Sequence, residues 1–159
     1  MLTVWRKCMK LAEALLLRVD LQKKLKLIEG RLVKNSKTQG DEPPSENPND
    51  LLLEFDECNK QWEELVQRIN KTNSFTKTET GHSIADMITR RDAIRQKLNS
   101  LYKLSENATV DVTRYSRSEI VQRSTISVPE IQKQINEYSK AYRELDTKLQ
   151  SLNWITELL

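Results

Sequence analysis

The chain has 159 residues, of which 37% are hydrophobic and 31% charged, with only three glycines and four prolines. This balance favours long helices over a compact α/β fold. The net charge of +3 is too small to suggest a nucleic-acid partner, which requires a strong basic excess on one face. No stretch has the length and apolar character of a transmembrane helix or a secretory signal, so we expect a cytoplasmic protein.

The first predicted helix spans Met9–Lys37. Its apolar seam, with steps of three and four residues, is interrupted by Arg18 and contains Leu11, Ala14, Leu21, Leu25, Ile28 and Leu32. Further apolar residues cover much of the remaining circumference, namely Leu15, Leu16, Leu17 and Val19. A helix that is apolar on several sides is buried on several sides, so this segment predicts a homo-oligomer. Gly30 inside the helix costs about 1 kcal/mol relative to Ala and allows close helix approach or a slight bend.

Residues 1–8 do not join this pattern. We therefore expect Met9 to be the natural start, residues 1–8 to be an upstream extension outside the fold, and residues 9–159 to form a single helical domain.

The second predicted helix follows a polar loop over residues 38–50, in which Asn47 suits the N-cap and Pro48 the first helical position. The helix is expected to run to about Asn70, with a seam of Leu51, Phe55, Cys58, Trp62, Leu65 and Ile69. Residues 9–38 carry eight Lys/Arg against three acids, and residues 39–64 carry nine acids against one Lys. This contrast predicts an antiparallel hairpin of a basic and an acidic helix, and a docking surface for another protein is the alternative.

Two stretches, residues 72–82 and 107–127, break the helical period. Gly81 suits a turn in the first stretch, and β-branched residues partly alternate in the second. The first break predicts a short β-hairpin or an ordered loop, and short strands of the second break can pair with Phe75–Thr80 in a small sheet. A third helix lies between them, with Ser83 at its start, Arg91 on its seam, and the apolar positions Ile84, Met87, Ile94, Leu98 and Leu101.

The fourth predicted helix begins at Ser127–Glu130, where Ser-x-x-Glu has the spacing of a capping box. Its heptad seam is the clearest in the chain and consists of Ile131, Ile135, Tyr138, Tyr142, Leu145, Leu149 and Leu152. The predicted class is therefore mainly α, with four long helices in a coiled-coil-like bundle and a small β element.

The chain lacks the residue arrangements that catalysis or metal binding needs. His82 is the only histidine and has no partner at catalytic or metal-ligand spacing. Cys8 and Cys58 form no CxxC pair, and free thiols fit a reducing compartment. The sequence therefore predicts no metal site and no cofactor and favours a protein without catalysis, while an active site assembled across subunits stays open.

One cluster in the second break is suited to anions. Arg114, Tyr115 and Arg117 lie close together beside two serines, and arginine binds phosphate or carboxylate in a bidentate manner. Arg91 on the third helix can face the same place. The alternative, which we favour, is that these arginines pair with helical carboxylates and stabilise helix ends.

Several segments resemble a family of small bacterial proteins catalogued as a domain of unknown function. The similar segments include Met9–Arg18, Ile69–Asn73, Arg114–Ile120, Tyr142–Asp146 and Leu152–Trp154, and the resemblance covers residues 9–159. Some members of the family are labelled septicolysin, which implies a secreted, thiol-activated pore-former. A secretion signal and a Trp-rich membrane tip are missing from the sequence, so we disfavour that function.

We therefore expect a cytoplasmic, non-catalytic, oligomeric scaffold or interaction protein. Its main partner is expected to be a second copy of itself, contacted through the first and fourth helices. The alternatives are a module that binds a small anionic ligand through the Arg114/Arg117 loop and a septicolysin-like cytolysin.

Overall fold

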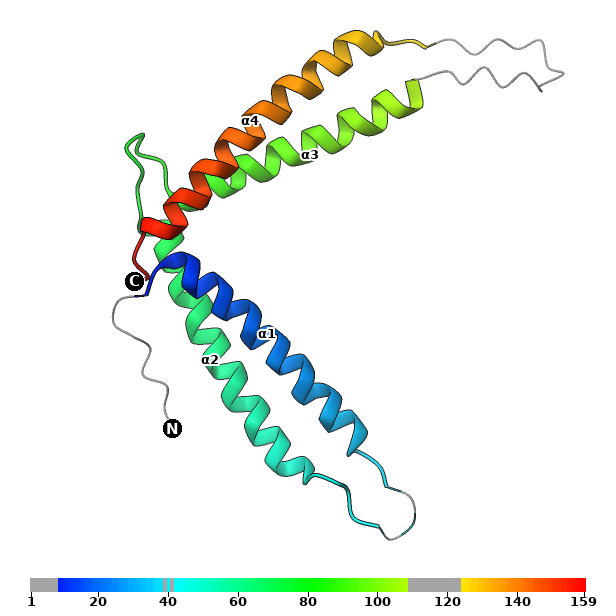
Figure 1. Ribbon diagram of the computed structural model, residues 1–159, viewed down its shortest axis with the longest axis vertical. Coiled ribbons are helices and arrows are strands. Elements are labelled where there is room, and N and C mark those ends of the chain that lie inside the picture. The colour runs from blue at the N-terminus through cyan, green and yellow to red at the C-terminus, as the bar shows by residue number, and fades with distance from the viewer. Residues whose placement is uncertain (1–8, 39, 41, 109–123) are drawn as a thin grey trace, which may run out of the picture. The chain divides into compact units, whose positions relative to one another are not determined.

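The computed structural model describes residues 9–38, 40, 42–108 and 124–159, and these residues form four helices (Figure 1). The helices are α1 (Leu11–Lys34), α2 (Pro48–Phe75), α3 (Ile84–Ala108) and α4 (Val128–Ile155). The mainly α class is confirmed. The chain divides into two compact units, residues 1–85 together with 150–159, and residues 86–149. Whether these units behave as the single predicted domain stays a prediction.

In the first unit, α1 and α2 form the antiparallel hairpin that the charge contrast predicts (Figure 1). The two seams meet and are buried, with Leu11, Ala14, Leu21 and Ile28 from α1 and Leu51, Cys58, Leu65 and Ile69 from α2. The Cys58 thiol lies 3.9 Å from the carbonyl oxygen of Leu21, so these two residues lie at the same height along the pair of helices. Each buried Leu or Ile contributes about 1.5–3 kcal/mol, so these seams hold the hairpin together.

The α2 helix begins as predicted and ends later than predicted. The side-chain oxygen of Asn47 accepts a hydrogen bond from the Asn49 N–H at 3.0 Å, and Pro48 is the first helical residue. The helix continues past Asn70 to Phe75, so the prediction of a strand beginning at Phe75 is wrong. The reason is a tertiary contact: the Thr72 side chain is fully buried, donates to the carbonyl of Arg68 and accepts from the N–H of Leu159.

A tight turn joins α2 to α3. The N–H of Thr78 donates to the carbonyl of His82, and Gly81 adopts a positive φ of 79°, in agreement with the predicted turn. Lys77 and Ser83 form an isolated antiparallel bridge, and the described residues contain no strand that is longer than such a bridge. The predicted pairing with the second break is not seen there, and most of that break, residues 109–123, lies outside the described part of the chain.

Residues 156–159, here named the clamp, join the start of α1 to the end of α2. The N–H of Leu11 donates to the carbonyl of Thr156 at 2.9 Å, and the N–H of Leu158 donates to the carbonyl of Met9 at 2.8 Å. The Leu158 side chain is buried. The clamp therefore closes the open end of the α1–α2 hairpin, opposite its connecting loop.

In the second unit, α3 and α4 lie side by side (Figure 1). Their core contains Leu98, Leu101 and Ile135, against which Ile94, Ile131, Tyr138 and Tyr142 pack. The residues from α4 belong to its predicted heptad seam. The helix begins at Val128, next to the predicted start, and the N–H of Ile131 donates to the carbonyl of Ser127 at 3.1 Å.

Candidate interaction surface

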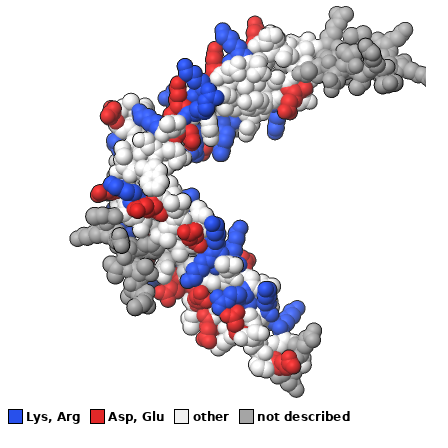
Figure 2. All heavy atoms as spheres, viewed as in Figure 1, with Lys and Arg blue, Asp and Glu red and all other residues white. Residues whose placement is uncertain are grey.

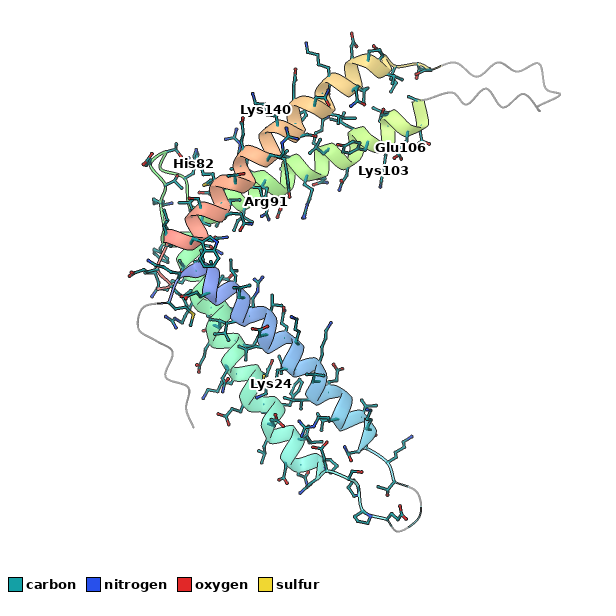
Figure 3. The ribbon with its side chains drawn as sticks, viewed as in Figure 1. Lys24, His82, Arg91, Lys103, Glu106 and Lys140 are labelled. Atoms are coloured by element: carbon teal, nitrogen blue, oxygen red, sulfur yellow. The ribbon has the colours of Figure 1, made fainter. Side chains whose placement is uncertain are left out.

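One flank of the α1–α2 hairpin is charged. The guanidinium of Arg31 donates from Nε to both carboxylate oxygens of Glu46 at 3.1 Å and from Nη1 to Glu54 at 3.0 Å. Lys24 lies 3.7 Å from Glu54 on the same flank. Figure 2 shows acidic and basic side chains interleaved over these two helices, and Figure 3 labels Lys24 among them. We name this flank the charged flank, and its charged side chains form ion pairs with one another within one chain.

The same contacts shift two pKa values. The hydrogen bond to Glu46 raises the pKa of Arg31 above its ordinary value, with a smaller contribution in the same direction from Glu54. The hydrogen bond from Arg31 lowers the pKa of Glu46. Glu46 is further positioned by Asn35, whose side-chain oxygen accepts from the Glu46 backbone N–H at 3.0 Å. Both side chains are therefore fully ionised at neutral pH.

The opposite flank of the hairpin carries a set of apolar side chains, interrupted by the exposed polar residues Gln22, Lys26 and Asn59. A helix turns by about 100° per residue, so Val19 and Val33 lie on the other side of the α1 seam from Lys24 and Arg31. By the same rotation, Phe55, Trp62 and Val66 lie on the other side of the α2 seam from Glu54. Ion pairs join Lys24 and Arg31 to Glu54, so these three residues lie on one flank of the hairpin. The apolar residues on the other side of the two seams therefore share the opposite flank. We name it the apolar flank, and its apolar residues are Leu15, Val19, Val33, Leu52, Phe55, Trp62 and Val66.

The apolar flank is incompletely covered by the described residues. Val19 is 39% exposed, Val33 69% and Leu52 49%, and Phe55, Trp62 and Val66 are half-buried. Two N–H groups at the seam edge of this flank, Arg18 Nε and Trp62 Nε1, are buried without a hydrogen-bond partner in the described part of the chain. Arg18, which the sequence places on the seam, is therefore half-buried and lacks an acceptor for one of its N–H groups.

The outward face of α1 carries further apolar residues. Leu16 is 60% exposed and Leu27 69%. A shallow hollow of about 500 Å³ lies beside Leu27 and is also lined by Gly30, Lys34 and Glu54. Apart from its chain neighbours and the nearby backbone of α1, no atom of the described chain lies within 4 Å of the place where a Cβ on Gly30 would lie, so the fold itself does not require a glycine there.

The predicted anion site is only partly described. Arg114, Tyr115 and Arg117 lie outside the described residues, so their grouping with Arg91 stays a prediction. Arg91 lies between α3 and α4 (Figure 3), 3.0 Å from Asp92 and 3.4 Å from Asp146. Burial lowers the pKa of Arg91, but the attraction of these carboxylates outweighs it and the net shift is upward. Arg91 thus joins the two helices by ion pairing, as in the favoured alternative.

The other residues that could take part in catalysis or metal binding do not lie close together. His82 is exposed in the turn before α3 (Figure 3). Cys58 is free and buried, and burial raises the pKa of its thiol. Among the described residues, no group of three or more His, Cys, Asp or Glu side chains is placed to hold a metal ion. The exposed feature that stands out in the described residues of the first unit is therefore its set of apolar side chains.

Residues 18–158 match the model of DUF6847, a family of unknown function. The chain belongs to this family. It is also similar to a solved structure titled "Crystal structure of a functionally unknown conserved protein from Corynebacterium diphtheriae", with 39% sequence identity and a TM-score of 0.89. That match covers 96% of this chain and 100% of the other. Comparison with curated proteins gives no match.

These comparisons confirm the expected membership of a family of unknown function and carry no septicolysin label. No helix in the described ranges combines the length and apolar character needed to cross a bilayer.

Proposed function

We propose that this member of DUF6847 is a non-catalytic interaction protein that assembles with further copies of itself. The observation that carries the proposal is the set of large apolar side chains that α1 leaves exposed: Leu16, Val19, Leu27 and Val33, with exposed fractions of 60%, 39%, 69% and 69%. A partner that covers this apolar surface removes it from water, which is the main favourable contribution to most protein–protein association.

The α4 helix provides a second contact region in this proposal. Trp154 and Ile155 near its end are 58% and 64% exposed. The heptad seams of the sequence suit coiled-coil packing between helices, and the unbridged, buried Cys58 thiol suits a cytoplasmic location.

Sedimentation velocity of the full chain over a range of concentrations tests the proposal. We expect a discrete species whose mass is a multiple of 18.6 kDa and whose population grows with concentration. A chain that sediments as a monomer up to about 100 µM would contradict self-assembly, because specific interfaces of ordinary size bind at micromolar concentrations or below.

A second candidate function, binding of a small anionic ligand by Arg114, Tyr115 and Arg117, is favoured by the residue types in that segment. A ligand that binds the folded state raises the melting temperature. We expect inorganic phosphate to do so in the native chain and not in an Arg114→Gln/Arg117→Gln variant. An equal response of both proteins would exclude this site. The septicolysin-like alternative predicts dye release from liposomes under reducing conditions, and intact liposomes would exclude it.

A further inference from the structure

We propose that the apolar flank of the α1–α2 hairpin is the interface with a second copy of the chain, in a two-fold dimer that stacks each α1 on the α2 of the other copy. This inference rests on the proposed function and specifies the surface that self-assembly uses. The charged flank is internally paired, whereas the apolar flank exposes Val19, Val33 and Leu52.

The geometry of a hairpin suits this arrangement. A two-fold axis parallel to the helices places two apolar flanks face to face and puts α1 of each copy over α2 of the other. The four helices then enclose the half-buried Phe55, Trp62 and Val66 in a common core, as in a four-helix bundle. Each copy thereby buries the apolar flank of the other copy.

Charge selects a second copy as the occupant. Within one chain, the basic residues 9–38 already pair with the acidic residues 39–64. In the two-fold dimer every α1 meets an α2 of the second copy, so flank residues of the basic segment meet flank residues of the acidic segment. The contact between Cys58 and Leu21 sets the register and puts Lys26 within one helical turn of Asp56 of the second copy. Both side chains are exposed, and no ion pair is formed by either of them within the described part of the chain.

The size of the flank is also sufficient. The 24 residues of α1 give a helix about 36 Å long, and two helices side by side are about 20 Å wide. The flank therefore offers about 700 Å² per copy, close to the roughly 800 Å² per partner of a standard interface.

The test is light scattering coupled to size exclusion on the full chain and three sets of variants. Wild type is expected to give about twice 18.6 kDa. Val19→Glu buries an unpaired charge in the proposed interface and is expected to weaken the dimer by on the order of 100-fold. Leu53→Glu, on the outward face of α2 at a position 69% exposed, is the matched control and is expected to leave the dimer unchanged. Circular dichroism of each variant reports whether the helices are retained.

A charge exchange gives an independent readout that does not depend on a core substitution. Lys26→Glu and Asp56→Lys are each expected to weaken the dimer by roughly 3- to 10-fold, since each sets like charges against each other, and the double variant is expected to restore it. An oligomer that resists Val19→Glu but dissociates with Leu53→Glu would overturn the flank assignment and leave self-assembly standing. A monomeric wild type would overturn the proposed function as well.

Discussion

The backbone N–H of Leu159 donates a hydrogen bond to the side-chain hydroxyl of Thr72 at 2.9 Å, across 87 positions of the chain. The same hydroxyl donates to the carbonyl of Arg68 at 2.9 Å, and the Nε of Arg68 donates to the carbonyl of Leu159 at 2.9 Å. One buried threonine thus joins the last turns of α2 to the clamp.

Thr72→Val is expected to destabilise the first unit by about 1–3 kcal/mol. The change removes the acceptor of the Leu159 N–H from a site with no exposed surface, and an unsatisfied buried N–H costs about this much. The urea midpoint measures the loss, and the amide exchange rate of Leu159 reports it locally. Thr147→Val on the exposed surface of α4 is the control and should leave both values unchanged.

Glu46 is expected to stabilise the fold only above the pH range in which a glutamate protonates. Its pKa is lowered in the folded state by Arg31, so its contribution is present above the unfolded-state value of about 4.3 and is lost as the pH falls through the folded-state value. The urea midpoint of wild type should exceed that of Glu46→Gln at pH 7, and the two should converge on acidification. A constant difference at every pH would rule out this linkage.

Leu101→Ala is expected to destabilise the second unit by about 2–5 kcal/mol, the usual cost of truncating a leucine in a core. Leu101 is 3% exposed and lies in the core cluster with Leu98 and Ile135. Leu104→Ala, one turn along the same helix and 42% exposed, is the matched control. Guanidinium unfolding should separate the two variants, and equal losses would mean that α3 buries a different face.

Gly30→Ala is expected to stabilise an isolated chain by about 0.5–1 kcal/mol, because alanine is the better helix former and no described atom obstructs the new methyl group. The melting temperature of dilute protein measures this gain. A loss of stability would indicate that a neighbouring helix approaches Gly30 closely. The comparison should be repeated at high concentration, where any such neighbour from another copy is present.

Cys58 is expected to resist thiol reagents in the folded protein. Its side chain is buried, and burial raises the pKa of the thiol, so little reactive thiolate exists at pH 8. A Cys8→Ser variant isolates the reaction of Cys58, whose rate should rise when urea opens the α1–α2 hairpin. Rapid labelling without denaturant would contradict a closed hairpin.

Local patterns predicted the parts of the fold that local forces determine. The α2 N-cap at Asn47 and the start of α4 after Ser127 follow from short-range hydrogen bonding, and both helices begin there. The charge contrast between residues 9–38 and 39–64 correctly predicted the hairpin, because ion pairs such as Arg31–Glu54 act between neighbouring helices.

Long-range contacts explain what the sequence patterns missed. The threonine-rich stretch after Asn70 has weak helix propensity, yet α2 continues through it because Thr72 is held by the clamp. Nothing in the local pattern of residues 156–159 indicates that they bond to Met9 and Leu11. The apolar flank could have been found from the sequence, since Val19, Phe55, Trp62 and Val66 follow helical spacing, but its separation from the charged flank required the ion pairs to be located.

The division of the chain has a consequence for its synthesis. The first unit contains residues 1–85 but also residues 150–159, whereas the second is one continuous stretch. On the ribosome, the α1–α2 hairpin emerges first. It lacks its contacts with residues 156–159 until α3 and α4 have been translated. The part of the protein that begins to fold earliest is therefore the last to be completed, and a nascent chain stalled before residue 156 exposes the buried ends of α1 and α2 to chaperones and proteases.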